Sequence, residues 1–200
     1  MPNYRRSREG TAYFFTVLTY RRRPILCLDE SPDALRAAIR EARMRLPFAI
    51  DAWVLLPDHL HCIWTLPEGG ADYSTRWGLM KAGFTRRVAR TLADGALLSA
   101  SRRKHRDGAP WQRRFWEHTL RDERDFAAHC DSPAQTRHPW RVRGTPIPGG
   151  DVHYNPVKHG LAAAPQDWVW STFHQFLEKG LYPKEWGTQP MAFEAGVGQE

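Results

Sequence analysis

The chain has 200 residues, of which 42% are hydrophobic and 12% are aromatic, and it carries a formal net charge of +7. This composition predicts a folded protein with a hydrophobic core. No apolar stretch reaches the roughly 18 residues that span a membrane, and no signal-peptide core follows the basic N-terminus, so we expect neither a membrane-spanning nor an exported protein. Three cysteines without paired spacing argue against disulfides or a zinc knuckle and favour a reduced cytoplasmic protein.

The first half of the chain alternates between strand and helix patterns. Residues 13–19 are rich in β-forming side chains and predict a buried strand. A Ser-Pro-Asp sequence, with Ser31 as N-cap, predicts the start of a helix that Pro47 ends. Two further strands are predicted at residues 48–56 and 59–66, with a tight Pro-Asp turn between them.

The pattern continues through the middle of the chain. Residues 74–92 predict a helix with apolar side chains on one face and basic side chains on the other. A polar, basic loop is predicted over residues 94–110, a fourth strand over 114–120 and a short helix over 122–131. Strand, helix, strand, strand, helix, strand is the order of a ferredoxin-like split βαβ fold. We therefore predict an α+β fold with helices on one face of an antiparallel sheet, plus a C-terminal extension.

His59 and His61 stand two residues apart in an otherwise apolar predicted strand. Because side chains alternate between the two faces of a strand, both histidines should point the same way, while Leu60 and Cys62 point into the core. Two adjacent imidazoles can hold one divalent metal ion. The alternative is a pair of surface histidines on an edge strand.

Positive charge is concentrated in residues 76–114, which hold eleven Lys or Arg against two acids, a net charge of +9. We therefore expect a polyanionic partner, and we favour nucleic acid over a membrane. The alternative is a solvated basic face without a partner. Tryptophans in and after this segment are expected to pack more often than to stack on bases, namely Trp111, Trp116, Trp168 and Trp170.

Five stretches of the chain, in order, match a known family. The chain resembles the REP-associated tyrosine transposases, bacterial relatives of the single-strand insertion-sequence transposases. The matching stretches are residues 13–17, 52–64, 111–118, 155–161 and 170–173. The resemblance implies metal-dependent cleavage and rejoining of DNA at palindromic repeats, single-stranded or hairpin DNA as partner, a monomer or homodimer, and a place at the bacterial nucleoid.

The same resemblance implies a chemistry for particular residues. His59, His61 and Asn155 match the metal ligands of the family, and the metal would be Mg²⁺ or Mn²⁺, acting as a Lewis acid on the scissile phosphate. A tyrosine hydroxyl would attack phosphorus, which leaves a covalent 5′-phosphotyrosyl link and a free 3′-hydroxyl.

The chain departs from the family where the nucleophile should be. The expected tyrosine lies four residues before the asparagine, but Asp151 occupies that position. A Pro- and Gly-rich insertion at 132–151 stands there instead and predicts a loop within a single domain at 1–187, followed by a tail at 188–200. Tyr154, the nearest tyrosine, is the candidate replacement nucleophile, although on a helix it would be turned about 100° from its neighbour Asn155. The alternative for Tyr154 is a packing role.

Several cations are candidates for contact with DNA phosphates, although Lys158 and His159 would also suit a helix end. The candidates are Arg86, Arg87, Arg90, Arg113, Arg114, Lys158 and His159. Three rival functions remain: a hairpin-binding protein that has lost its nucleophile, an RNA-binding ferredoxin-like module, and a metal hydrolase without nucleic acid. RNA-binding modules of this fold usually carry aromatic residues on the sheet face, where this chain places histidines.

Overall fold

The computed structural model describes residues 11–94, 110–122, 125–126, 129 and 152–188. The chain divides into two compact units. The first, called here the sheet unit, comprises Ser7–Asp51 and Leu55–Thr119. The second, called here the C-terminal unit, comprises Ala52–Val54 and Leu120–Glu200, together with residues 1–6. No helix among the described residues is both long enough and apolar enough to cross a membrane.

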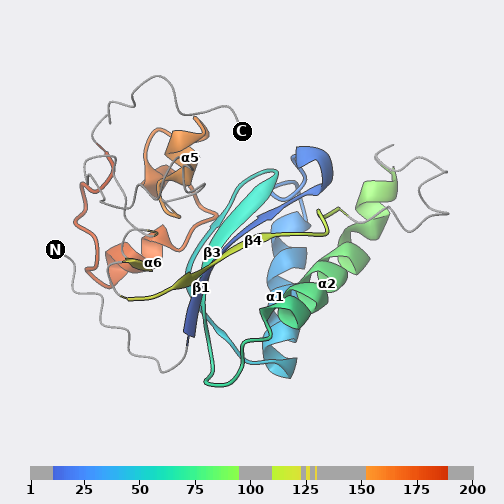
Figure 1. Ribbon diagram of the computed structural model, residues 1–200. Coiled ribbons are helices and arrows are strands. Elements are labelled where there is room, and N and C mark those ends of the chain that lie inside the picture. Colours follow the sequence, from blue (N-terminus) through green and yellow to red (C-terminus); the bar gives the residue numbers. More distant parts are fainter. Residues whose placement is uncertain (1–10, 95–109, 123–124, 127–128, 130–151, 189–200) are drawn as a thin grey trace, which may run out of the picture. The chain divides into compact units, whose positions relative to one another are not determined.

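A four-stranded sheet in the order β2-β3-β1-β4 forms the frame of the fold (Figure 1). Its strands are β1 (Thr11–Leu18), β2 (Ala49–Leu55), β3 (His59–Leu66) and β4 (Trp116–Leu120). The two inner strands, β1 and β3, are antiparallel, with Leu18 opposite His59. The predicted third strand is confirmed to the residue, and the other three are confirmed with shifted ends.

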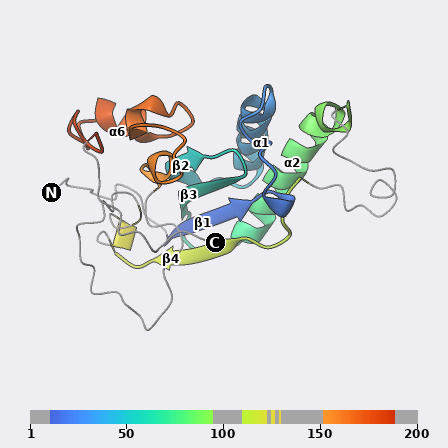
Figure 2. The same ribbon diagram turned by 90° about the horizontal axis from the view of Figure 1, so that it is seen from above.

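Helices α1 (Ser31–Arg45) and α2 (Tyr73–Asp94) lie together on one side of the sheet (Figure 2). Helix α1 has proline in its first turn, as predicted, but its N-cap is Glu30 rather than Ser31. Helix α2 buries four apolar residues at helical spacing, which is why this face covers the sheet. These residues are Trp77, Met80, Phe84 and Val88.

Aromatic side chains form much of the core between α2 and the sheet. The ring of Trp64 on β3 stacks on that of Trp77 on α2, with centroids 4.3 Å apart. Phe15 on β1 meets the same Trp77 ring edge-on at 5.5 Å, and Phe84 meets Trp111 at 5.1 Å. Trp111 is buried, which agrees with the packing role expected for it.

The C-terminal unit includes the short helices α5 (Asn155–Lys158) and α6 (Phe173–Glu178). Its core is aromatic, with Tyr182 stacked on Trp186 at a centroid distance of 4.5 Å. The predicted insertion at 132–151 and most of the predicted loop at 94–110 lie outside the described residues. Of the predicted helix at 122–131, residues 122, 125, 126 and 129 are described, and all of these except residue 122 are helical.

Candidate functional site

His59 and His61 lie side by side on one face of β3. Trp64 packs on helix α2, so alternation places Leu60 and Cys62 toward the helices and the two histidines on the opposite face. The imidazole centroids are 4.9 Å apart and the rings are nearly perpendicular. Each histidine is only 4% exposed and β3 is an inner strand, so the alternative of surface histidines on an edge strand is wrong.

His61 is oriented by its neighbours on β1. Thr16 stands directly opposite it in the strand pairing, and the Thr16 hydroxyl lies 2.9 Å from Nδ1 of His61. The ring of Phe14 stacks against the imidazole at a centroid distance of 5.7 Å. Because a hydroxyl can donate or accept a hydrogen bond, Thr16 fixes the position of the ring without fixing its tautomer.

His59 is oriented by a carboxylate. Its Nδ1 lies 2.7 Å from Oδ1 of Asp58, and Nε of Arg22 lies 2.9 Å from Oδ2 of the same group. Burial opposes ionisation of Asp58, but the hydrogen bond and charge of His59 and the charge of Arg22 outweigh it and hold its pKa below the usual value. An ionised carboxylate only accepts, so Nδ1 of His59 carries the proton.

This arrangement suits a divalent metal ion. With Nδ1 of each imidazole engaged by Thr16 or Asp58, Nε2 is the ring nitrogen that would ligate a metal in both His59 and His61. A histidine whose second nitrogen donates to a carboxylate or another oxygen is the usual surrounding of a metal-binding imidazole. Asn155 belongs to the C-terminal unit, where it is 1% exposed, and its role as a third ligand stays a prediction.

Helix α2 carries three of the predicted DNA-binding arginines. The guanidinium of Arg87 lies 3.0 Å from the Glu41 carboxylate and that of Arg86 lies 3.7 Å from it. The hydrogen bond and charge of Arg87, followed by weaker charge effects of Arg86, lower the pKa of Glu41. Glu41 therefore already balances part of this charge, an interaction that sequence reasoning missed. The side chain of Arg90 lies outside the described residues.

Arg113 and Arg114 are both exposed, immediately before β4. Nearby on α2, Lys81 donates a hydrogen bond of 2.8 Å to the carbonyl oxygen of Gln112, with its ammonium group 5.3 Å from the ring centroid of Phe115. Burial lowers the pKa of Lys81 to about 8. The sheet unit thus presents two exposed cations beside a partly buried third, and DNA binding by them stays a prediction.

The C-terminal unit holds the remaining predicted residues. Tyr154 is 2% exposed, and its ring lies edge-on to Trp186 with centroids 6.3 Å apart. Lys158 and His159 are exposed at the end of α5. The surroundings of Tyr154 fit a packing role, and no described contact tests it as a nucleophile.

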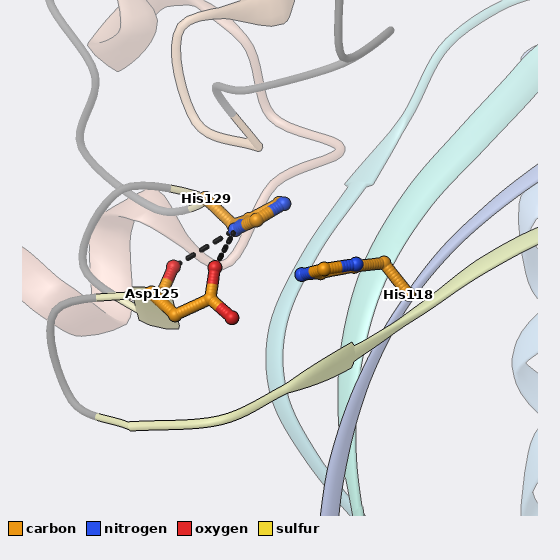
Figure 3. A group of neighbouring side chains, drawn as sticks. All are labelled: His118, Asp125 and His129. Atoms are coloured by element: carbon orange, nitrogen blue, oxygen red, sulfur yellow. Dashed lines mark hydrogen bonds and ion pairs between the residues drawn. The ribbon is translucent and has the colours of Figure 1, made fainter. Parts of the chain in front are cut away.

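The C-terminal unit also contains a carboxylate–histidine pair that sequence reasoning did not select. Nδ1 of His129 lies 2.8 Å from the backbone oxygen of Asp125 and 3.4 Å from its Oδ1 (Figure 3). The i, i+4 spacing on a short helix was the available signal. His118, drawn in the same figure, belongs to β4, where it stacks on Trp116 with centroids 6.0 Å apart.

Comparison with known proteins identifies the family. A REP-associated tyrosine transposase of Escherichia coli (strain K12) is 38% identical over 199 residues, which are 98% of this chain and 97% of that protein. The chain belongs to the REP-associated tyrosine transposases. A further relative from Haemophilus influenzae is 34% identical over 191 residues, 95% of this chain and 96% of its own. No family model matches the chain.

A solved structure of a REP-associated tyrosine transposase bound to a REP hairpin is also similar to this chain. The TM-score is 0.67 at 37% sequence identity, and the match covers 100% of this chain and 99% of the other. The resemblance drawn from the sequence motifs is therefore confirmed. The α+β class, with a four-stranded sheet and helices, is confirmed with it.

Proposed function

We propose that this protein is a DNA transposase that cleaves and rejoins single-stranded DNA at palindromic repeats, with hairpin DNA as its partner. The observation that carries the proposal is the buried pair of His59 and His61, each with Nδ1 engaged by an oxygen, in a chain 38% identical to a REP-associated tyrosine transposase. The ferredoxin-like assignment, a site of action at the nucleoid and a monomeric or homodimeric state belong to the same proposal.

Different residues of the chain would bind the metal ion and the DNA backbone. His59 and His61, with Asn155, would hold Mg²⁺ or Mn²⁺, which when bound supplies Lewis-acid polarisation of the scissile phosphate. The amide and phosphate oxygens suit Mg²⁺ and Mn²⁺ alike, and a site that combines them with imidazole tolerates these harder ions. Exposed cations such as Arg113 and Arg114 would hold the DNA backbone, since phosphate contacts fix the register of a strand without reading its sequence.

Cleavage needs a hydroxyl nucleophile, and Tyr154 is the candidate nearest to Asn155. Its oxygen would form a bond to phosphorus while the bond from phosphorus to the 3′ oxygen breaks. The phenolic proton is lost and the leaving oxygen gains one, so the products are a 5′-phosphotyrosyl link and a 3′-hydroxyl. The same exchange run backwards onto another 3′-hydroxyl would rejoin the strand without a nucleotide cofactor.

A second function, hairpin binding without cleavage, is favoured by the surroundings of Tyr154. Its side chain is almost fully buried beside Trp186, and Asp151 occupies the position four residues before Asn155. A polarised phosphate without an aligned attacker reacts slowly, because positioning contributes roughly 7–11 kcal/mol to such reactions.

A labelled DNA hairpin incubated with the protein and Mn²⁺ separates the two functions. A covalent adduct on a denaturing gel that disappears in Tyr154→Phe supports the transposase with Tyr154 as nucleophile. Hairpin binding without an adduct supports the binding protein. Competition between DNA and RNA hairpins of the same sequence serves as control, and equal or better binding of RNA would contradict both functions.

A further inference from the structure

The turn that follows β1 has an unusual backbone. Arg21 and Arg22 both adopt a φ of 55°, which lies in the left-handed region that residues other than glycine rarely adopt. The turn is held in place by Thr19, whose hydroxyl lies within hydrogen-bonding distance of the carbonyl oxygens of Arg23 and Asp58, at 2.8 and 2.9 Å. Backbone strain that the surroundings enforce in this way is often found at functional sites.

The consequence of this turn is the direction of one side chain. Arg22 reaches Asp58, with Nε 2.9 Å from Oδ2, and the other oxygen of Asp58 lies 2.7 Å from Nδ1 of His59. Arg21 shares the same backbone conformation, but its guanidinium lies over the ring of Tyr20, 5.4 Å from the centroid. The strained turn therefore gives Asp58 a partner on the side away from the histidine.

We propose that Arg22 and Asp58 are positioning residues that fix the tautomer and orientation of His59 for metal binding. The inference rests on the proposed function, because it takes His59 as a ligand. Asp58, which accepts from Nδ1, assigns the proton to that nitrogen and makes Nε2 the ligating atom. Arg22 acts through Asp58: it holds the second carboxylate oxygen, so the group cannot rotate away from His59.

The two histidines consequently differ. His59 is bound by a carboxylate that admits one tautomer, whereas His61 is bound by the Thr16 hydroxyl, which admits both. His59 therefore has the tautomer that a metal needs before the metal binds, whereas His61 can take that tautomer when the metal binds. Partners of metal-binding histidines typically change affinity by roughly 10–100-fold when removed.

Nitrogen-15 NMR of the metal-free protein tests the role of Asp58 without any activity. In the neutral form of its ring, wild-type His59 should show a single tautomer protonated at Nδ1, and His61 should show a mixture. Asp58→Asn keeps the shape of the side chain but can donate to Nδ1, so the Nε2-protonated form should appear at His59. A His59 tautomer that is mixed in the wild type, or unchanged in Asp58→Asn, would overturn the proposal.

Mn²⁺ titration calorimetry tests the role of Arg22. Arg22→Gln should weaken Mn²⁺ binding by about tenfold, the lower end of the range for such partners, and Arg21→Gln, the matched control, should change it less than twofold. Because Arg22 acts through Asp58, the double variant Arg22→Gln, Asp58→Asn should bind no more weakly than Asp58→Asn alone. Additive losses, or equal effects at Arg21 and Arg22, would overturn the proposal.

Different results would contradict the proposed function and the positioning role of Arg22 and Asp58. A wild-type protein that binds no Mn²⁺ while its His59 shows the Nδ1-protonated tautomer would contradict the proposed function. Normal Mn²⁺ binding that is insensitive to both Arg22→Gln and Asp58→Asn would leave the proposed function standing and remove only this inference. Thermal unfolding of each variant shows whether a loss reflects the site or the fold.

Discussion

The two segments that carry the predicted metal ligands are built in different ways. On β3, the histidines sit on an inner strand, and their partners Thr16 and Asp58 lie on the adjacent strand or in the adjoining turn. Asn155 instead follows a buried hydrogen-bond network centred on His153, whose Nδ1 lies 2.7 Å from the Tyr182 hydroxyl. Strand pairing therefore positions the ligands of the first segment, whereas hydrogen bonds to one neutral imidazole hold the second segment in place.

The network around His153 is closed on its other side by Thr172. Nε2 of His153 lies 2.9 Å from the Thr172 hydroxyl, which also accepts a hydrogen bond of 2.8 Å from the backbone of Trp53. Phe176 packs edge-on against the imidazole with centroids 4.5 Å apart. Because burial lowers the pKa of His153 and keeps this imidazole neutral, we expect the segment before Asn155 to lose stability in acid.

The largest expected effect on stability concerns pH. Burial lowers the pKa of His153 from 6.5 to about 3, so the unfolded chain takes up a proton before the folded one does. Stability from this residue is complete above about pH 6.5 and is lost as the pH falls toward 3, by up to about 5 kcal/mol. Urea unfolding between pH 7 and 4 measures the free energy of unfolding of the wild type and of His153→Gln. The wild type should lose more stability in acid than the variant, and parallel pH profiles would contradict this prediction.

A smaller effect is expected from the partner of this histidine. Thr172→Val keeps the shape of the side chain but removes the oxygen shared by His153 and the Trp53 amide. Leaving buried polar groups unsatisfied costs about 1–3 kcal/mol. The control is Thr16→Val on β1, which should lower Mn²⁺ affinity more than Thr172→Val does. Chemical denaturation measures the stability of Thr172→Val and Thr16→Val, and Mn²⁺ titration measures their metal affinity. Equal losses of stability and of Mn²⁺ affinity in the two variants would contradict the difference between the two segments.

The smallest effect concerns the cations of the sheet unit. Arg87 and Arg86 are already paired with Glu41, whereas Arg113 and Arg114 are exposed. Arg113→Gln, Arg114→Gln should lower the salt dependence of hairpin binding by roughly 0.7–0.9 logarithmic units per lost phosphate contact. Arg86→Gln, Arg87→Gln should lower it less. Fluorescence anisotropy over a salt series measures both slopes, and a steeper loss at Arg86 and Arg87 would show that DNA displaces Glu41.

Sequence reasoning succeeded where one local pattern decides the structure. The alternation around His59 and His61 predicted both the strand and the shared face, because period two admits one arrangement once Leu60 and Cys62 are buried. It missed Arg22, because a left-handed turn built from two arginines has no sequence signal of the kind that glycine provides. It also missed Glu41 as a partner of Arg87, since that pair joins two helices far apart in sequence.

Mn²⁺ binding by the paired histidines is the most direct test of the account. Calorimetry should show one Mn²⁺ site in the wild type and its loss in His59→Gln, His61→Gln, by more than the roughly 100-fold seen for outer partners of metal ligands. His174→Gln, on α6 of the C-terminal unit, is the matched control and should bind normally. Mn²⁺ binding that survives unchanged in a folded His59→Gln, His61→Gln protein would contradict the account.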